Sequence, residues 1–135
     1  MITDFWVAGI PQSQGSAKAY VRGNRAIVTS ANANLKPWRD AVHTAFQANF
    51  SELLTAPIEV ELAFVLPRPK SLPKTRIVPH TKKPDLDKLV RAIFDSGTGV
   101  AWADDANVDR VSASKRYADI GEQSGVHIHV TGGNA

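Results

Sequence analysis

Four aspartates in the second half of the chain stand where their carboxylates could serve metal-dependent chemistry. Asp85 and Asp87 are separated by one residue in KKPDLDKLVRAIFD, residues 82–95, and a second pair follows at Asp104 and Asp105. Carboxylate oxygens are hard ligands that favour Mg²⁺, with Mn²⁺ as a substitute. Three carboxylates that converge without a cation repel one another strongly. If Asp85, Asp87 and Asp105 meet, the pattern therefore predicts an Mg²⁺ site.

Each pair also has a purely structural interpretation. An aspartate at the start of a helix accepts hydrogen bonds from free backbone amides and offsets the macrodipole, which contributes ~1 kcal/mol. Capping therefore accounts for one of Asp85 and Asp87, and a polar turn accounts for Asp104-Asp105. The metal site requires that the strand starting near Val108 returns beside the helix and carries Asp105 with it.

Basic residues surround the first acidic pair. The formal net charge is only +3, yet eight of the sixteen lysines and arginines lie between residues 68 and 91. A basic stretch attracts phosphates, although a solvated loop is the alternative. Mg²⁺ lowers the pKa of bound water and stabilises the charge that develops during phosphodiester hydrolysis. Arg91 or Lys88 could stabilise the same charge, but Arg91 also has the spacing of an ordinary helix ion pair with Asp87.

The elements that position these residues follow from the period of the apolar side chains. The pattern predicts strands at 2–10, 58–66, 108–117 and 124–132, a hairpin at 19–28, and helices at 36–50 and 85–96. Residues 67–84 hold five prolines and form a long basic loop. This order predicts one α+β domain over residues 1–135, with a mixed, mostly antiparallel sheet and two helices packed on one face.

Several classes of protein are disfavoured by composition. The chain has no cysteine, so disulfides and thiolate metal sites are excluded. The opening residues lack the pattern of a signal peptide, and no apolar run approaches the ~20 residues of a membrane span, so we expect a cytoplasmic protein. Gly15-Ser16-Ala17-Lys18 lacks P-loop spacing, which argues against binding of nucleoside triphosphates.

Histidine and tryptophan residues offer weaker signals. His127 and His129 alternate in the last predicted strand and share a face, but no third ligand is near in sequence. Polar side chains on an exposed face are the favoured interpretation. Trp38 lies on an apolar helix stripe and is expected in the core. Trp102, beside the second acidic pair, is the tryptophan best placed to stack on bases.

The segment KKPDLDKLVRAIFDSGTGVAWADDANV, together with the strand that ends in KRY, resembles the signature of RusA-type Holliday-junction resolvases of bacteria and phages. The match covers about residues 82–117. In that family the Asp-x-Asp and the second Asp of Asp-Asp form the metal site, which implies Asp85, Asp87 and Asp105 as metal ligands and catalytic residues. A family lysine falls on Arg91, which is therefore a fourth catalytic candidate. Arginine binds phosphate as a fork but does not donate a proton as lysine can.

The resemblance implies a mixed α/β homodimer that resolves four-way DNA junctions by paired symmetric nicks, in DNA recombination and repair. Two symmetric cuts call for two sites related by a two-fold axis. It places the protein in a bacterial or phage-infected cell. The residues expected to bind DNA are Lys74, Arg76, Lys82, Lys83, Lys88, Arg91, Lys115 and Arg116.

Two other functions fit parts of the sequence. A non-catalytic DNA-binding accessory protein would use the basic loop for phosphate contacts and the aspartates as caps. It would bind DNA with a steep salt dependence and without a need for Mg²⁺. A nucleotide-sugar transferase with an Asp-x-Asp motif is disfavoured, because the chain is too short for the usual nucleotide domain and the basic bias stays unexplained.

Overall fold

The fold is built on a four-stranded mixed sheet with the strand order β1-β6-β4-β5. A computed structural model describes residues 1–15, 18–23, 25–29, 32–74 and 76–133, with the backbone alone for 18–22 and 25–29. The strands are β1 (Ile2–Ala8), β4 (Thr55–Leu66), β5 (Val108–Tyr117) and β6 (Gly125–Gly133). Strand β6 pairs antiparallel with β1 and β4, whereas β5 pairs parallel with β4. The predicted mixed, mostly antiparallel sheet is confirmed.

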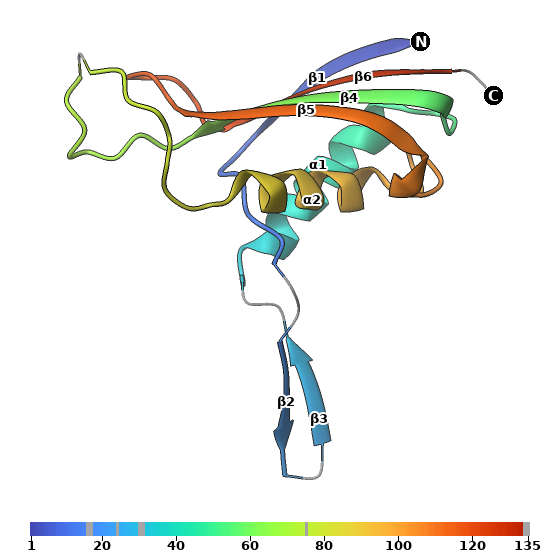
Figure 1. Cartoon of the computed structure of the whole chain (residues 1–135), viewed down its shortest axis with the longest axis horizontal. Coiled ribbons are helices and arrows are strands. Elements are labelled where there is room, and N and C mark those ends of the chain that lie inside the picture. Colours follow the sequence, from blue (N-terminus) through green and yellow to red (C-terminus); the bar gives the residue numbers. More distant parts are fainter. Residues whose placement is uncertain (16–17, 24, 30–31, 75, 134–135) are drawn as a thin grey trace.

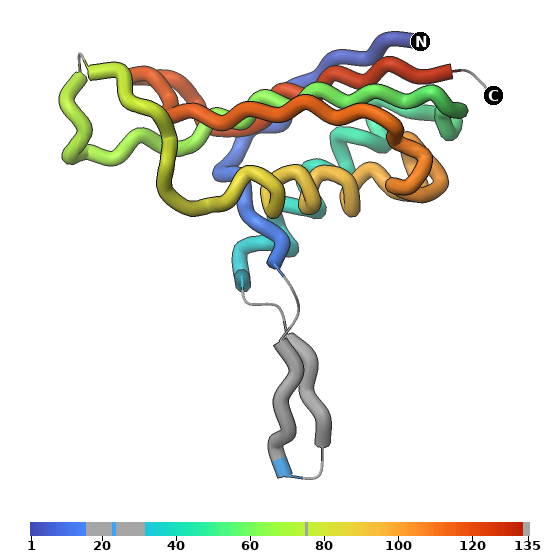
Figure 2. The backbone as a smooth tube through the Cα atoms, in the orientation of Figure 1, coloured from blue at the N-terminus to red at the C-terminus, as the bar shows by residue number. Residues whose placement is uncertain are grey.

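Two helices cover one face of this sheet, as the sequence predicted (Figure 1). They are α1 (Leu35–Asn49) and α2 (Leu86–Gly97). The predicted hairpin forms a separate antiparallel pair of β2 (Lys18–Arg22) and β3 (Arg25–Thr29). The basic loop, residues 67–84, contains no helix or strand among its described residues. Figure 2 shows that it extends past the end of the sheet, on the side where α2 begins.

The core lies between the sheet and the helices and follows the periods seen in the sequence. Alternate residues of β4, such as Ile58 and Val60, are fully buried, and α1 buries Trp38, Val42 and Phe46 on one stripe. These residues form one continuous apolar cluster with the buried side of α2. Packing in this core therefore fixes the distance between α2 and the sheet and determines which side of α2 faces the sheet.

The turn after α2 is also anchored in this core. Trp102 is fully buried and packs edge-on against Phe46 and Phe94, each at a ring separation of 5.6 Å. A methyl group at Gly97 would lie 2.7 Å from the Trp102 ring, so only glycine allows this close approach. The prediction that Trp102 stacks on bases is wrong. Its role is to hold the end of α2, and with it the following Asp-Asp pair, against the core.

None of the helices among the described residues is long and apolar enough to cross a membrane.

Candidate active site and DNA interface

The first acidic pair lies at the start of α2, on the side of the basic loop. Asp85 is the N-cap residue, with extended backbone angles, but its side chain makes no capping hydrogen bond. Its carboxylate lies 3.6 Å from the Lys88 ammonium, and both side chains are about half exposed. Asp87 is exposed in the first turn of α2. Capping by its side chain therefore does not account for Asp85, and both carboxylates are open to solvent.

Lys115 holds the basic loop against this end of α2. Its ammonium donates hydrogen bonds to the carbonyl oxygens of Lys82 at 2.8 Å and Pro84 at 3.0 Å. Two of the three N–H donors of Lys115 are therefore used within the chain. The contact brings Lys82 and Lys83, whose side chains are exposed, next to Asp85. A phosphate drawn to these lysines would lie near the first acidic pair.

The middle of the basic loop is held by Arg68. Its guanidinium donates to the carbonyl oxygens of Pro73 at 2.5 Å, Arg76 at 2.9 Å and Ala118 at 3.5 Å. The His80 ring also stacks on Tyr117 at 4.4 Å. Burial and the nearby Lys115 charge lower the pKa of His80, which favours the neutral ring beside Tyr117. Arg68 is thus a structural cation, and the loop has a defined path.

The basic residues expected to bind DNA differ in whether their charged groups already form an ion pair within the chain. Lys74 and Arg76 are exposed on the basic loop. Arg116, in contrast, makes a two-pronged ion pair with Glu122, at 2.6 and 2.7 Å. Hydrogen bonds from Arg116 lower the pKa of Glu122 to about 2. A phosphate would have to compete with Glu122 for Arg116.

Arg91 lies one turn after Asp87 on the exposed side of α2. Among the described residues it makes no ion pair, so the alternative interpretation of an Asp87–Arg91 helix pair has no support in the geometry. Asp95 continues the same stripe at the next turn, where it accepts a hydrogen bond from the Gln14 side-chain amide. The outer side of α2 therefore alternates acid, base and acid along its length.

The second acidic pair lies beyond the other end of α2, in the short helix η1 (Asp105–Asn107). Asp104 caps it: its carboxylate accepts from the Ala106 amide at 2.9 Å, while the Asn107 side chain accepts from the Asp104 amide at 3.0 Å. Asp104 therefore has a structural role. Asp105 is exposed, and its carboxyl group shares a hydrogen bond with Asp104.

Electrostatics distinguishes the two members of this pair. The pKa of Asp104 is lowered by its hydrogen bond from the Ala106 amide and by a hydrogen bond with Asp105. That shared hydrogen bond raises the pKa of Asp105, and the negative charges of Asp104 and Asp95 add to the effect. Asp105 thus sits in a locally acidic environment that a bound cation would relieve.

One chain does not bring the three predicted ligands together. Asp85 and Asp87 lie at the start of α2, whereas Asp105 lies beyond its end, and a helix of 12 residues is about 18 Å long. Strand β5 does return beside α2, but it runs in the opposite direction, so its far end, at Lys115, reaches the carbonyl oxygen of Pro84 just before Asp85. Within the described parts of the chain, no three His, Asp or Glu side chains are grouped to hold a metal.

Each end of α2 nevertheless has ligand chemistry that suits Mg²⁺. This ion is often held by one or two carboxylates, with water and substrate phosphate completing its shell. Asp85 with Asp87 offers such a pair at one end, and Asp105 offers an exposed carboxylate at the other. Among the described residues, the carboxylates that could bind Mg²⁺ are therefore divided between the two ends of α2.

His127 and His129 lie on the face of the sheet away from the helices. The structure adds a third residue that the sequence did not suggest: Asp4 on β1, whose carboxylate is 3.1 Å from His127 and 2.8 Å from His129. The three side chains are partly exposed and bound to one another. The interpretation as polar residues on an exposed sheet face is confirmed.

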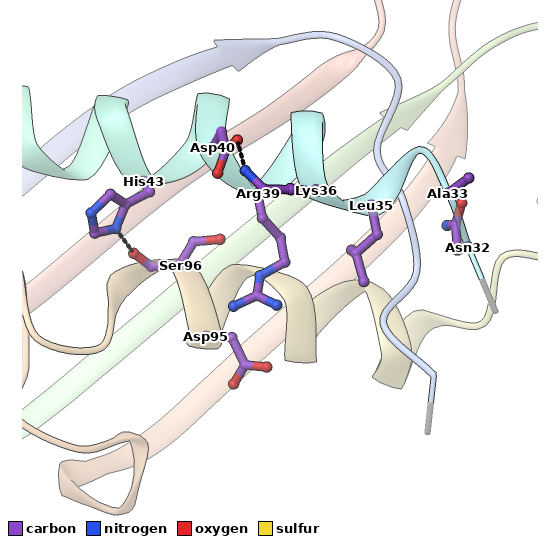
Figure 3. Close-up of a pocket in the computed structure, with 9 residues that line it drawn as sticks. All are labelled: Asn32, Ala33, Leu35, Lys36, Arg39, Asp40, His43, Asp95 and Ser96. Atoms are coloured by element: carbon purple, nitrogen blue, oxygen red, sulfur yellow. Dashed lines mark hydrogen bonds and ion pairs between the residues drawn. The ribbon is translucent and has the colours of Figure 1, made fainter. Parts of the chain in front are cut away.

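Sequence reasoning also missed a pocket between α1 and α2, to which Arg39 and His43 contribute (Figure 3). The only signal was their spacing of four residues on the polar flank of α1. Nothing in the sequence indicated that this flank would face α2.

Comparison with known proteins identifies the class to which this fold and these acidic residues belong. Residues 9–131 match the family described as Endodeoxyribonuclease RusA, a range that includes both helices, β4, β5 and most of β6 but not β1. The chain belongs to this family, and the resemblance carried by the Asp-x-Asp and Asp-Asp segments is confirmed. Among individual proteins, it is similar to Uncharacterized protein YqaN of Bacillus subtilis (strain 168). The two are 25% identical over 125 residues, covering 85% of this chain and 87% of YqaN.

Proposed function

We propose that this protein is a Mg²⁺-dependent, structure-selective endonuclease that resolves four-way DNA junctions by paired symmetric nicks. Membership of an endodeoxyribonuclease family supports the reaction class. The observation that carries the proposal is at the start of α2. There, an N-cap carboxylate that makes no capping bond stands beside exposed Asp87 and the lysine-rich end of the basic loop.

The charge pattern supports a polyanionic substrate. The basic loop presents Lys74, Arg76, Lys82 and Lys83 to solvent, and its path ends at the first acidic pair. Phosphate contacts of this kind supply most of the affinity for DNA and position the strand. The lysines would thus bring a phosphodiester to the carboxylates, which have no use in DNA binding alone.

The residues proposed to hold the metal are Asp85, Asp87 and Asp105. When bound, Mg²⁺ supplies a water of lowered pKa and neutralises the charge that develops on the phosphate. Mn²⁺ has the same preference for oxygen ligands and is the expected substitute. Arg91, one turn after Asp87 and free of any ion pair among the described residues, is placed to bind the same phosphate.

We further infer that the protein acts as a homodimer and that each complete site takes residues from both copies. Two chains related by a two-fold axis, with their α2 helices antiparallel, would set the start of one α2 against the end of the other. Asp85 and Asp87 would then meet Asp105 of the partner subunit. Such a pairing creates two equal sites, about one helix length apart, which suits two symmetric nicks.

A nicking assay on synthetic four-way junctions tests the proposed function. Wild type should cut with Mg²⁺ and bind without cutting in EDTA, and Asp87→Asn should bind but not cut. Asp104→Asn is the matched control, because asparagine keeps the cap on η1 and should leave cutting near the wild-type rate. Tight, Mg²⁺-independent binding by a wild-type protein that never cuts would favour the non-catalytic accessory protein instead.

A further inference from the structure

The pocket between α1 and α2 has no role in the site described so far. It encloses about 590 Å³, and Figure 3 shows its walls: Arg39 and His43 come from α1, and Asp95 and Ser96 from α2. The pocket lies toward the Asp105 end of α2, because its lining residues from this helix, Asp95 and Ser96, are in the last turn before Gly97. Its charged residues therefore border one half of the proposed nuclease site.

Arg39 is the cation in this pocket that lacks a partner. Its side chain is half-buried, and in Figure 3 the guanidinium points from α1 toward α2, in the pocket that Asp95 also lines. It makes no hydrogen bond or ion pair with a described residue. Lys36, at the mouth, is bound to Asp40 at 2.8 Å. The guanidinium therefore has N–H donors that are free to bind an acceptor entering the pocket.

The surroundings of Arg39 favour an anionic acceptor. Helix α1 begins at Leu35 beside the pocket, with no side-chain cap and no acidic residue in its first turn. The positive end of its macrodipole is therefore not offset locally. Asp95, in contrast, would reduce the attraction for a small free anion. The combination suits a phosphate that is delivered as part of a bound strand.

His43 fixes the width of this pocket. Its Nδ1 lies 2.9 Å from the carbonyl oxygen of Ser96, which can only accept, so Nδ1 carries the proton and donates. This hydrogen bond joins the middle of α1 to the end of α2. It holds Arg39 at a set distance from the helix that leads to Asp105.

We propose that the pocket between α1 and α2 binds a phosphate of the DNA strand, with Arg39 as its ligand and His43 as a positioning residue. The inference rests on the proposed nuclease function and deepens it. It adds a strand contact at the Asp105 end of α2, in addition to the lysines at the Asp85 end. A strand bound at both places would lie along the exposed side of α2.

Junction binding in EDTA, followed by fluorescence anisotropy over a range of salt concentrations, tests this contact without any cutting. Arg39→Ala should bind about tenfold to a hundredfold more weakly, the usual range for loss of a hydrogen bond to a charged group. Its salt slope should fall by about one. Arg39→Lys should be intermediate, because the charge stays but the planar fork is lost. Inorganic phosphate should not compete with the junction.

Arg110→Ala is the matched control. Arg110 is an exposed arginine 3.8 Å from Glu59, which alternates along β4 with the buried Ile58 and Val60, so its loss should leave both affinity and salt slope unchanged. His43 provides a second test. His43→Asn keeps a donor where Nδ1 stands and should retain binding, whereas His43→Gln places its amide elsewhere and should weaken binding.

Two results would overturn the inference. One is an Arg39→Ala protein that binds the junction as tightly as Arg110→Ala. The other is weaker binding with an unchanged salt slope and a lowered melting temperature, which would mean that Arg39 supports the fold. Parallel cutting assays with Mg²⁺ keep the two proposals apart. A wild type that binds but never cuts refutes the nuclease, whereas an Arg39→Ala protein that binds and cuts normally refutes the pocket alone.

Discussion

Two inactive variants of this protein should restore activity to each other when they form mixed dimers. The variants are Asp87→Asn, which damages the start of α2, and Asp105→Asn, which damages the segment beyond its end. If each site joins the start of one α2 to the end of the other, a mixed dimer holds one intact site. Its second site carries both substitutions.

The expected recovery of nicking activity follows from the fraction of intact sites in the mixture. Random exchange of equal amounts gives one mixed dimer in about every two, each with one of its two sites intact, so the mixture should nick at about a quarter of the wild-type rate. A single chain offers no such site among its described residues, because the two acidic pairs lie toward opposite ends of α2, which is about 18 Å long, whereas oxygens that share one Mg²⁺ lie within ~4 Å of each other.

The assay uses a supercoiled plasmid with an extruded cruciform, on which one nick gives an open circle and two coordinated nicks give a linear product. The two variants are unfolded and refolded together so that subunits exchange. Nicking should return, but linear product should stay near zero because each mixed dimer has only one working site. A mixture of Asp85→Asn and Asp87→Asn is the matched control. Both changes lie at the start of α2, so neither site of their mixed dimer is intact.

The reasoning fails if the mixture of Asp87→Asn and Asp105→Asn stays as inactive as its components while wild type refolded in the same way cuts. That result would place all ligands of a site within one chain. Recovery of nicking in the control mixture of Asp85→Asn and Asp87→Asn would also refute the shared-site arrangement, because that arrangement leaves no intact site in their mixed dimer. Size measurement on both mixtures establishes that dimers have formed.

Three further predictions concern single residues. Trp102→Ala should destabilise the fold by about 3–5 kcal/mol in urea unfolding, because the ring is fully buried, whereas Trp6→Ala at a position 43% exposed should cost far less. Arg91→Ala should lower the cutting rate on four-way junctions more than the affinity, and Arg91→Lys should retain activity; equal loss in both variants would argue for a steric role. Glu122→Gln should remove a pH-dependent part of the stability. The pKa of Glu122 is about 2 in the fold against an ordinary 4.5, so its contribution is present above pH 4.5 and lost as the pH falls toward 2. Urea unfolding of both proteins across this range should show curves that converge at low pH.

The secondary structure was largely predictable because the apolar residues keep strict periods. Strand β5 has the predicted bounds, 108–117, and α2 is displaced by one residue from the predicted 85–96. Helix α1, Leu35–Asn49, begins and ends one residue before the predicted 36–50. Local periodicity decides such features, so a single sequence is enough to find them.

The relative positions within the site were not predictable by the same means. The sequence shows that Asp105 follows the predicted helix that became α2. The distance between Asp105 and Asp85, however, depends on the length of α2 and on the direction of β5. The depth of Trp102 depends on the close approach at Gly97, and Arg39 faces α2 only because of how two helices pack. These are long-range consequences of packing, which residue types and spacing do not encode locally.

The hydrogen bonds of Arg68 have a consequence for the thermodynamics of binding. A loop with five prolines whose middle is held by one guanidinium has already lost much of its conformational entropy when the chain folds. If its exposed lysines bind DNA as proposed, they would do so as a preorganised surface, and little further ordering would oppose association. Arg68, which contacts only carbonyl groups of its own chain, would thus govern affinity for DNA without touching it.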